Sequence, residues 1–410
     1  MMDGYQLISL VIVLTASFAF INSRFLKLPS SIGIMLLSLV FSVLMVLSGN
    51  LFPHLSSSII RPLQSIRFGE LLMNFMLSFL LFAGAINIDS QRLKRHRLSI
   101  LLLASVGVLI STFIIGTVLY FIFELLHERV NFIYCLLFGA LISPTDPVAA
   151  LGILRKANIP KSFQIKIVGE SLFNDGFAIV VFLTLLSVAK AGIDNFSAWN
   201  LLILFIKETG GGLLFGAVLG YGGYLMLRSI NNYEVEVQIT LAIVTGGYVL
   251  ADSLFVSAPI AIAMAGIIIG SKTKKAVSEE TQDYLEKFWE IIDVTLNSVL
   301  FLLIGIEMLL ITVNSSLILI GCIMMIIVLG ARYVSVLIPF SILHWFLSFE
   351  KHTVSILTWG ALRGGISVAV ALSLPLEMHR NEFLTITYIV VVFSILIQGL
   401  TIEKFVKKLL

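Results

Sequence analysis

The chain has 410 residues, of which 58% are hydrophobic and only 12% are charged, and its net charge is +3. Ordinary soluble domains do not have this composition, and so small a net charge gives no reason to expect a nucleic-acid partner. The composition predicts an all-α polytopic membrane protein, because a helix needs about 20 apolar residues to cross roughly 30 Å of hydrocarbon.

Apolar segments between charged or Gly-, Pro- and Asn-rich breaks predict about thirteen transmembrane helices. The first seven are expected near residues 5–22, 31–48, 69–87, 98–125, 132–154, 164–189 and 201–227. The other six are expected near 236–253, 257–270, 288–311, 315–343, 353–374 and 383–401. The first segment lacks the basic stretch and cleavage site of a signal peptide, so it is expected to stay in the membrane.

Loop charges predict the orientation, because Lys and Arg accumulate on the cytoplasmic side of a membrane. On the thirteen-span topology one side receives the four basic clusters, at 92–97, 155–166, 272–275 and 404–408. Arg61 and Arg67 fall on the other side and are the exception. The N-terminus is therefore expected outside the cell and the C-terminus in the cytoplasm.

Two of the predicted spans are interrupted. The fifth contains SPTDP, in which Pro144 and Pro147 each remove an amide donor at mid-membrane, and the twelfth contains WGALRGGIS around Arg363. The breaks are seven spans apart and so run in opposite directions, which predicts an inverted repeat of spans 1–6 and 8–13 with the seventh as a linker. Such a pair of broken helices is typical of a transporter's substrate site.

The sixth span carries GESLFNDG, residues 169–176, inside an apolar sequence. At 100° per residue, its polar side chains share one arc of the helix: Glu170, Ser171, Asn174 and Asp175. Small polar residues also pack membrane helices together, so a packing role is the alternative for Ser171 and Asn174. Asp175 has no base near it in its own helix and is expected to be functional, because a charge inside a membrane is costly.

The break in the fifth span supplies further polar groups. Its first half ends at Ile142 in unpaired carbonyls, whose partial negative charge attracts cations. The freed Thr145 carbonyl is expected to be a cation ligand, because hard cations prefer oxygen. The second half is predicted to begin at Pro147 with Thr145 or Asp146 as its cap, and Asp146 is expected to be a cap more than a ligand.

Arg363 needs a partner inside the membrane, because its guanidinium is always charged. Glu170 is the expected partner, and the alternative is that Arg363 binds the carbonyls at its own break. Arg332 and Glu307 also lie in or near spans. The sequence assigns no partner to either, and structural pairing or snorkelling is expected for both.

If Arg363 neutralises Glu170, Asp175 is left as the group that can change state. A buried carboxylate resists ionisation, so it can hold a proton or a desolvated monovalent cation, but not both. If either loaded form lets the protein alternate between its two states and the empty anion does not, one cation is exchanged for one proton. These residues therefore predict an electroneutral antiporter.

Three motifs, SPTDPVAALGIL, GESLFNDG and WGALRGGISVAVALSLP, together resemble the NhaP/NHE-type sodium/proton antiporters in order and spacing over nearly the whole chain. The resemblance implies a cell-membrane homodimer of NhaA/NapA-like fold, with an interface domain and a moving core that contains two crossed broken helices. On that plan the five segments are 1–97 (interface helices 1–3), 98–190 (core helices 4–6), 191–228 (linker helix 7), 229–312 (interface helices 8–10) and 313–410 (core helices 11–13).

The resemblance also implies an ion site made of the Asp175 carboxylate, the Ser171 side chain, the Thr145 carbonyl and Glu170. Na⁺ or Li⁺ would be exchanged for H⁺ there, with no cofactor and no organic substrate. Asn174 resembles the asparagine of electroneutral members, where electrogenic relatives have a second aspartate. Arg363 resembles the arginine that pairs with the glutamate.

Other functions fit the sequence less well. A hydrolase with Ser171 as nucleophile would need a histidine at its depth, and the six histidines lie in loops or near the ends of spans. A cation channel could use Asp175, but no repeated filter sequence is visible. A potassium/proton antiporter is the main alternative, because cation selectivity depends on cavity geometry that the sequence does not determine.

Overall fold

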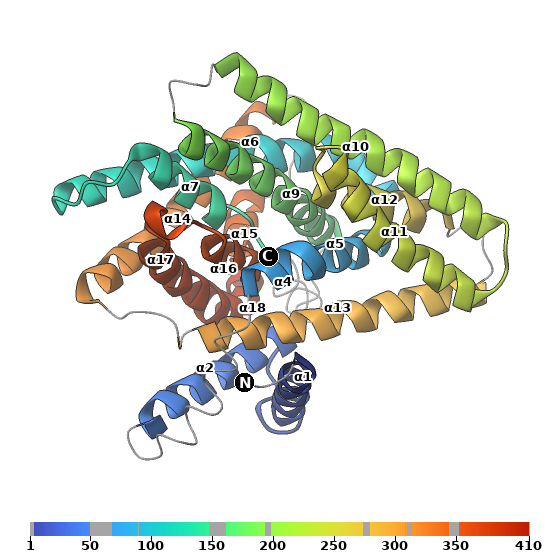
Figure 1. Ribbon diagram of the computed structural model, residues 1–410, viewed down its shortest axis with the longest axis horizontal. Helices are drawn as coiled ribbons and strands as arrows, with labels where there is room; N and C mark the ends of the chain where they lie inside the picture. Colours follow the sequence, from blue (N-terminus) through green and yellow to red (C-terminus); the bar gives the residue numbers. More distant parts are fainter. Residues whose placement is uncertain are drawn as a thin grey trace.

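The computed structural model describes residues 4–49, 68–88, 90–146, 161–192, 198–273, 279–307, 309, 314–343 and 352–409. All regular secondary structure in these residues is helical (Figure 1). Nine helices of the described chain are long and apolar enough to cross a membrane. The prediction of an all-α polytopic membrane protein is confirmed.

The first three spans agree with their predicted windows to within a few residues. They are α1 (Gly4–Ile21) with a π-helical turn (Asn22–Leu26), α2 (Ser30–Gly49), and α4 (Phe68–Leu71) joined by a π-helical turn (Leu72–Met76) to α5 (Leu77–Ile86). Arg61 and Arg67, the exceptions to the charge rule, lie outside the described residues.

The next three helices carry the sixth-span motif and the first break. They are α6 (Ser90–Leu125), α7 (Phe132–Ile142) and α9 (Lys161–Ala191). Helix α6 begins earlier than the predicted fourth span at 98, because the basic stretch 92–97 forms the first turns of the helix. The expected second half of the fifth span, from Pro147, lies outside the described residues.

The middle of the chain forms α10 (Ala198–Arg228), α11 (Tyr233–Ser253), α12 (Ala258–Thr273) and α13 (Glu279–Glu307). The last part forms α14 (Ser315–Leu343), α15 (Thr353–Trp359), α16 (Gly365–Leu372), a 3₁₀ turn (Leu376–Met378), α17 (Arg380–Phe393), a π-helical turn (Ser394–Gln398) and α18 (Gly399–Leu409). The helix of the twelfth span stops at Trp359 and resumes at Gly365, so the break predicted from its glycines is confirmed.

Helix packing follows the symmetry expected of the inverted repeat. Helix α5 of the third span packs on α12 of the ninth, and α2 of the second packs on α13 of the tenth. The fourth and eleventh spans, α6 and α14, pack on each other. A two-fold axis that exchanges spans 1–6 with spans 8–13 maps the α5–α12 contact onto the α13–α2 contact. The same axis maps the α6–α14 contact onto itself. In Figure 1, the long α13 lies between α1–α2 and the rest of the chain.

Small residues let α6 and α7 approach closely. A Cβ atom on Gly116 would lie 2.9 Å from the carbonyl oxygen of Cys135 and from the Cα of Leu136. A Cβ atom on Gly139 would collide with the carbonyl oxygen of Thr112. Glycines at such crossings are typical of membrane helices, whose association depends on close packing. This crossing holds α7, and with it the first break, in place.

We expect Gly116→Leu to lower the midpoint of thermal unfolding in detergent. Its side chain would collide with the backbone of α7, and such overpacking costs about 1–3 kcal/mol. Gly222→Leu on α10 is the control, because a Cβ there meets no atom within 4 Å. Equal midpoints for the two variants would contradict the close crossing of α6 and α7.

Candidate functional site

The two helix breaks meet each other directly. Residues 143–146 follow α7 without helical structure, and residues 361–364 separate α15 from α16. The backbone N–H of Asp146 donates to the carbonyl oxygen of Leu362 at 2.7 Å. Irregular backbone is tolerated in a bilayer only where protein or a cavity surrounds it. Here the two broken segments provide hydrogen-bond partners for each other's backbone.

Arg363 lies at the end of α7. Its Nη1 donates to the carbonyl oxygens of Ser143 and Pro144, the second at 2.9 Å. Helix C-termini carry unpaired carbonyls with a partial negative charge, so a buried guanidinium is stabilised there. The expected pairing of Arg363 with Glu170 is wrong. The alternative is wrong as well, because these carbonyls belong to the opposite break and not to Arg363's own.

Asp146 makes the reciprocal contact. Its carboxylate lies against Gly364, the residue that precedes α16, where an added Cβ would be 2.5 Å from Oδ2. Only glycine leaves room for this approach. The carboxylate thus lies at the positive N-terminal end of α16, where a negative charge is stabilising. Each break therefore supplies the charge that balances the helix end in the other.

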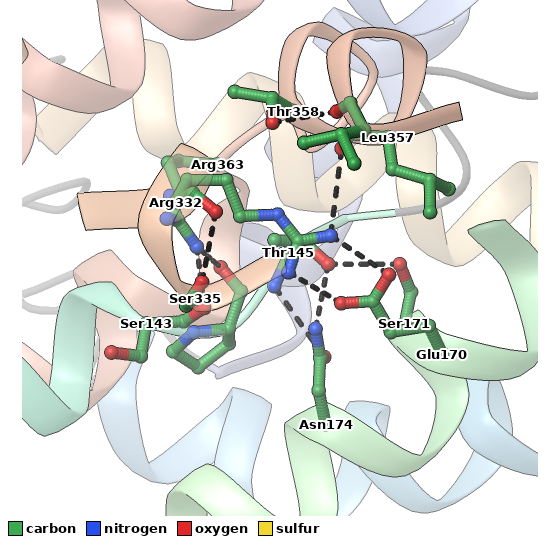
Figure 2. A network of polar contacts seen from close by, with 12 residues as sticks. Ser143, Thr145, Glu170, Ser171, Asn174, Arg332, Ser335, Leu357, Thr358 and Arg363 are labelled. Carbon is green, nitrogen blue, oxygen red and sulfur yellow. Dashed lines mark hydrogen bonds and ion pairs between the residues drawn. The ribbon is translucent and has the colours of Figure 1, made fainter. Parts of the chain in front are cut away.

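The partner of Glu170 is Arg332 of α14 (Figure 2). Arg332 Nη1 donates to Oε1 of Glu170, and Nη2 donates to Oε2 at 2.7 Å. Both side chains are buried, with 1% of Glu170 and 5% of Arg332 exposed. Two-pronged pairing of this kind is the strongest geometry for a carboxylate and a guanidinium. The pair is electrically neutral, and the structural pairing expected for Arg332 is confirmed.

Thr145 connects the first break to the polar arc of α9. Its Oγ1 lies 2.9 Å from Oγ of Ser171 and accepts a 2.7 Å hydrogen bond from Nδ2 of Asn174. Its backbone N–H donates to Oδ1 of Asn174 at 3.5 Å. Figure 2 shows these side chains converging on Thr145. Ser171 and Asn174 therefore position the break, so their packing role is real.

Asp175 lies beside this network, and 4% of it is exposed. Its Oδ1 is buried and has no hydrogen-bond partner among the described residues. A carboxylate oxygen left without a partner is costly, so this one is suited to bind a proton or a cation.

A cavity of about 460 Å³ reaches Asp175 and is also lined by Thr145 and Asp146. It extends past Asn87, at the end of α5, and Gln164, in the first turns of α9. Among the lining residues that the structure describes, the charged side chains are all acidic: Asp146, Asp175 and Asp293. This sign of charge favours cations.

The structure sorts the predicted site residues into two groups. Thr145, Asp146 and Asp175 line the cavity, whereas Ser171, Asn174, Glu170 and Arg363 lie behind this surface and hold it. Sequence reasoning missed that Arg332 is the partner of Glu170, and it did not single out Asp293. For each there was a signal, since Arg332 is a second arginine inside an apolar span and Asp293 stands one turn before Asn297 in another.

The family model of the transmembrane sodium/hydrogen exchangers matches residues 10–408. The chain belongs to the sodium/hydrogen exchanger family. It is 47% identical to the Na⁺/H⁺ antiporter NhaP of Pseudomonas aeruginosa, over 98% of this chain and 96% of that protein. It is 31% identical to the Na⁺/H⁺ antiporter NhaH of Halobacillus dabanensis, over 100% and 99% of the two chains. The family predicted from the three motifs is confirmed.

A solved structure shares the fold of this exchanger. The sodium proton antiporter MjNhaP1 of Methanocaldococcus jannaschii, determined at pH 8, superposes with a TM-score of 0.76 at 20% identity. The match covers 100% of this chain and 98% of that one. The predicted fold is therefore confirmed for this exchanger.

In this exchanger we expect Glu170→Gln and Arg332→Gln each to lower the free energy of unfolding by about 3–5 kcal/mol, because each leaves one buried charge uncompensated. The loss of unfolding free energy in the double variant should be smaller than the sum of the losses in the two single variants, as expected for groups in contact. The measurement is a double-mutant cycle of thermal unfolding in detergent. Glu170→Gln combined with Arg363→Gln is the control and should be closer to additive. The pairing is refuted if the second cycle shows the stronger coupling.

Proposed function

We propose that this protein exchanges Na⁺ or Li⁺ for H⁺ across the membrane, with the cation and the proton competing for Asp175. The observation that carries the proposal is the buried, unpartnered Oδ1 of Asp175 beside the cavity and the first helix break. The names of the relatives from Pseudomonas and Halobacillus support Na⁺ and H⁺ as the exchanged ions.

The charges of the other site residues support one-for-one exchange. Glu170 is neutralised by Arg332, Arg363 lies on the carbonyl end of α7, and Asp146 lies at the N-terminal end of α16. None of these groups needs to gain or lose a proton as the ion binds. The exchange is therefore electroneutral, because Asp175 alone carries either one Na⁺ or one H⁺.

For the ion's ligands we propose the Asp175 carboxylate, the Thr145 carbonyl and the Ser171 hydroxyl, since Na⁺ takes oxygen ligands. Ser171 lies behind the cavity surface but within 2.9 Å of Thr145 Oγ1, so a small shift of Thr145 would bring its hydroxyl to the ion. Glu170 is assigned a positioning role, because Arg332 occupies both of its carboxylate oxygens. Through this pair Glu170 holds α9 against α14, and so fixes Asp175 about 1.4 turns further along the same helix. Asn174 and Asp146 support the site by holding the break.

We further propose alternating access in a homodimer, as the family resemblance implies, with the N-terminus outside and the C-terminus in the cytoplasm, as the basic loop clusters predict. The cavity extends toward the end of α5 and the start of α9, which is the side of the basic first turns of α6. Basic residues mark the cytoplasmic side, so this state faces inward. Helices α5, α9, α13 and α16 all contribute lining residues to the cavity. Movement of the core, 98–190 and 313–410, past the interface helices then exposes Asp175 to the outside. In a cell this exchange couples the Na⁺ gradient to internal pH.

We expect Asp175→Asn to fold and to lose exchange by at least about a hundredfold, since an amide binds neither a proton nor Na⁺ as a carboxylate does. Purified protein in sealed liposomes with an imposed pH gradient is followed by an internal pH dye as Na⁺, Li⁺ or K⁺ is added. Asp283→Asn is the control, because that exposed carboxylate on α13 pairs with Lys287 at 2.6 Å.

Wild-type exchange by the Asp175 variant would refute the assignment of the site. A response of the unmodified protein to K⁺ alone would keep the mechanism and change the substrate. Cation current without proton movement would replace the antiporter with a channel.

We expect exchange by the unmodified protein to be unaffected by a clamped membrane potential. Asn174→Asp adds a second carboxylate beside Asp175 and is expected to make the exchange rate depend on the membrane potential. The rate should be higher when the potential drives protons in the direction in which they are being transported. The measurement is the rate of internal pH change at two clamped potentials. An Asn174→Asp variant that folds and stays electroneutral would show that residue 174 alone does not set the stoichiometry.

A further inference from the structure

The wall of the cavity holds a second buried oxygen without a hydrogen-bond partner. Among the described residues that line the cavity, two side-chain oxygens are buried and unpartnered: Oδ1 of Asp175 and Oγ of Ser367, in the first turn of α16. Only 1% of Ser367 is exposed. A buried hydroxyl that makes no hydrogen bond is costly, so it indicates a ligand that enters the cavity.

The break before α16 explains why the Ser367 hydroxyl is left over. A serine or threonine inside a helix often donates to the backbone carbonyl four residues earlier. Ser298 of α13 and Thr358 of α15 donate in this way, at 2.7 Å and 2.8 Å. For Ser367 the corresponding carbonyl belongs to Arg363, which lies in the broken segment and not in a helix. The interruption therefore makes this hydroxyl available to another partner.

The contacts of Gly364 place Ser367 in the ion site. Gly364 is the N-cap of α16 and Ser367 is the third residue of that helix, so the two positions are neighbours in the first turn. The Asp146 carboxylate lies against Gly364, where an added Cβ would be 2.5 Å from Oδ2. Asp146 is in turn close enough to Asp175 to act on it electrostatically. Ser367 thus belongs to the same part of the cavity as the two aspartates.

The two serines of the site differ in how their hydroxyls are engaged. Ser171 Oγ lies 2.9 Å from Oγ1 of Thr145 and behind the cavity surface, whereas Ser367 Oγ has no partner and its residue lines the cavity. A hydroxyl oxygen has two lone pairs, and hard cations take oxygen ligands. The positive end of α16 would oppose a cation there, but the Asp146 carboxylate balances it.

We propose that the Ser367 hydroxyl is a further oxygen ligand of the Na⁺ or Li⁺ that Asp175 binds. This inference rests on the proposed function and adds to it a ligand from the second broken helix. Each break then contributes one oxygen to the ion, the Thr145 carbonyl from the first and the Ser367 hydroxyl from the second. Because α9 and α16 both belong to the proposed moving core, the hydroxyl stays with Asp175 in both states.

The test is the KM for Na⁺ and for Li⁺ of exchange in everted and right-side-out membrane vesicles. We expect Ser367→Ala to raise both KM values roughly three- to tenfold on both faces, as for the loss of one neutral ligand, with an unchanged maximal rate. Ser373→Ala is the matched control, because the Ser373 hydroxyl at the end of the same helix donates to the Val370 carbonyl at 2.7 Å and lies outside the cavity.

A pair of variants of similar shape separates the hydroxyl from the bulk of the side chain. Ser367→Thr keeps the hydroxyl, and Ser367→Val has a methyl group in its place. The Thr variant should keep a KM near that of the unmodified protein, and the Val variant should show the rise expected of Ser367→Ala. This comparison tests the idea independently if the Ala variant does not fold.

A binding measurement on the purified protein removes transport from the comparison. When Na⁺ replaces choline at constant total salt, a ligand that binds only the folded protein raises the midpoint of thermal unfolding. The Na⁺ concentration that gives half of this rise should be roughly three- to tenfold higher for Ser367→Val than for Ser367→Thr, by the same loss of one ligand.

Each remaining outcome is also decisive. An unchanged KM in Ser367→Ala, an equal rise in the Thr and Val variants, a rise on one face only, or a loss of maximal rate with unchanged KM would overturn the ligand role of Ser367. None of these results affects the proposed function, which fails separately if Asp175→Asn retains exchange in the same vesicles.

Discussion

The fold depends on hydrogen-bond partners for the backbone groups that are left free where α7 ends and where α16 begins. Inside a membrane no water is available for these groups, so every free carbonyl and every helix end needs a protein partner. Arg363 donates to the last carbonyls of α7, Asp146 lies at the start of α16, and the Asp146 N–H donates to Leu362. Neither break is satisfied by its own helix alone. The two interruptions therefore have to be built together, and their crossing fixes where the Thr145 carbonyl lies.

Once the breaks are satisfied, the charges around them balance in pairs. The Glu170–Arg332 ion pair is weak evidence for stability, because taking two charges out of water costs about as much as their attraction returns. Its effect is on position: the guanidinium of Arg332 holds both oxygens of the Glu170 carboxylate and so ties α9 to α14. The hydrogen bonds of Ser171 and Asn174 to Thr145 then join α9 to the crossing. Asp175 is left as the buried group of this cluster with an unpartnered oxygen. One variable charge in a neutral frame is what one-for-one exchange requires.

Much of this arrangement could be predicted from the sequence, because a bilayer ties apolar length to helix. The window 315–343 coincides with α14, and prolines and glycines indicated both breaks. The starts of α6 and α13 were placed too late, since basic and acidic residues continue a helix beyond the hydrocarbon. The partner of Glu170 could not be predicted. Sequence gives the depth of Arg332 and Arg363 but not which helices lie side by side, and 162 residues separate Arg332 from Glu170. Asp293 was overlooked because it stands outside the three motifs.

The contact between α13 and α16 is apolar, which suits the proposed movement of the core past the interface helices. Along α13, Asp293, Asn297 and Leu300 line the cavity, and Ile304, one turn beyond Leu300, does not. At that point a Cβ on Gly365 would collide with the Leu300 side chain and lie 3.0 Å from Cδ1 of Ile304. The cavity thus ends where apolar side chains meet a glycine. Dispersion contacts are individually weak and are readily exchanged for similar ones one turn further along. The strong polar contacts of the site, in contrast, join α7, α9, α14 and α16 to one another. The polar contacts thus join the helices that we propose to move as one unit, and the apolar contact with α13 lies on the surface along which we propose that they move.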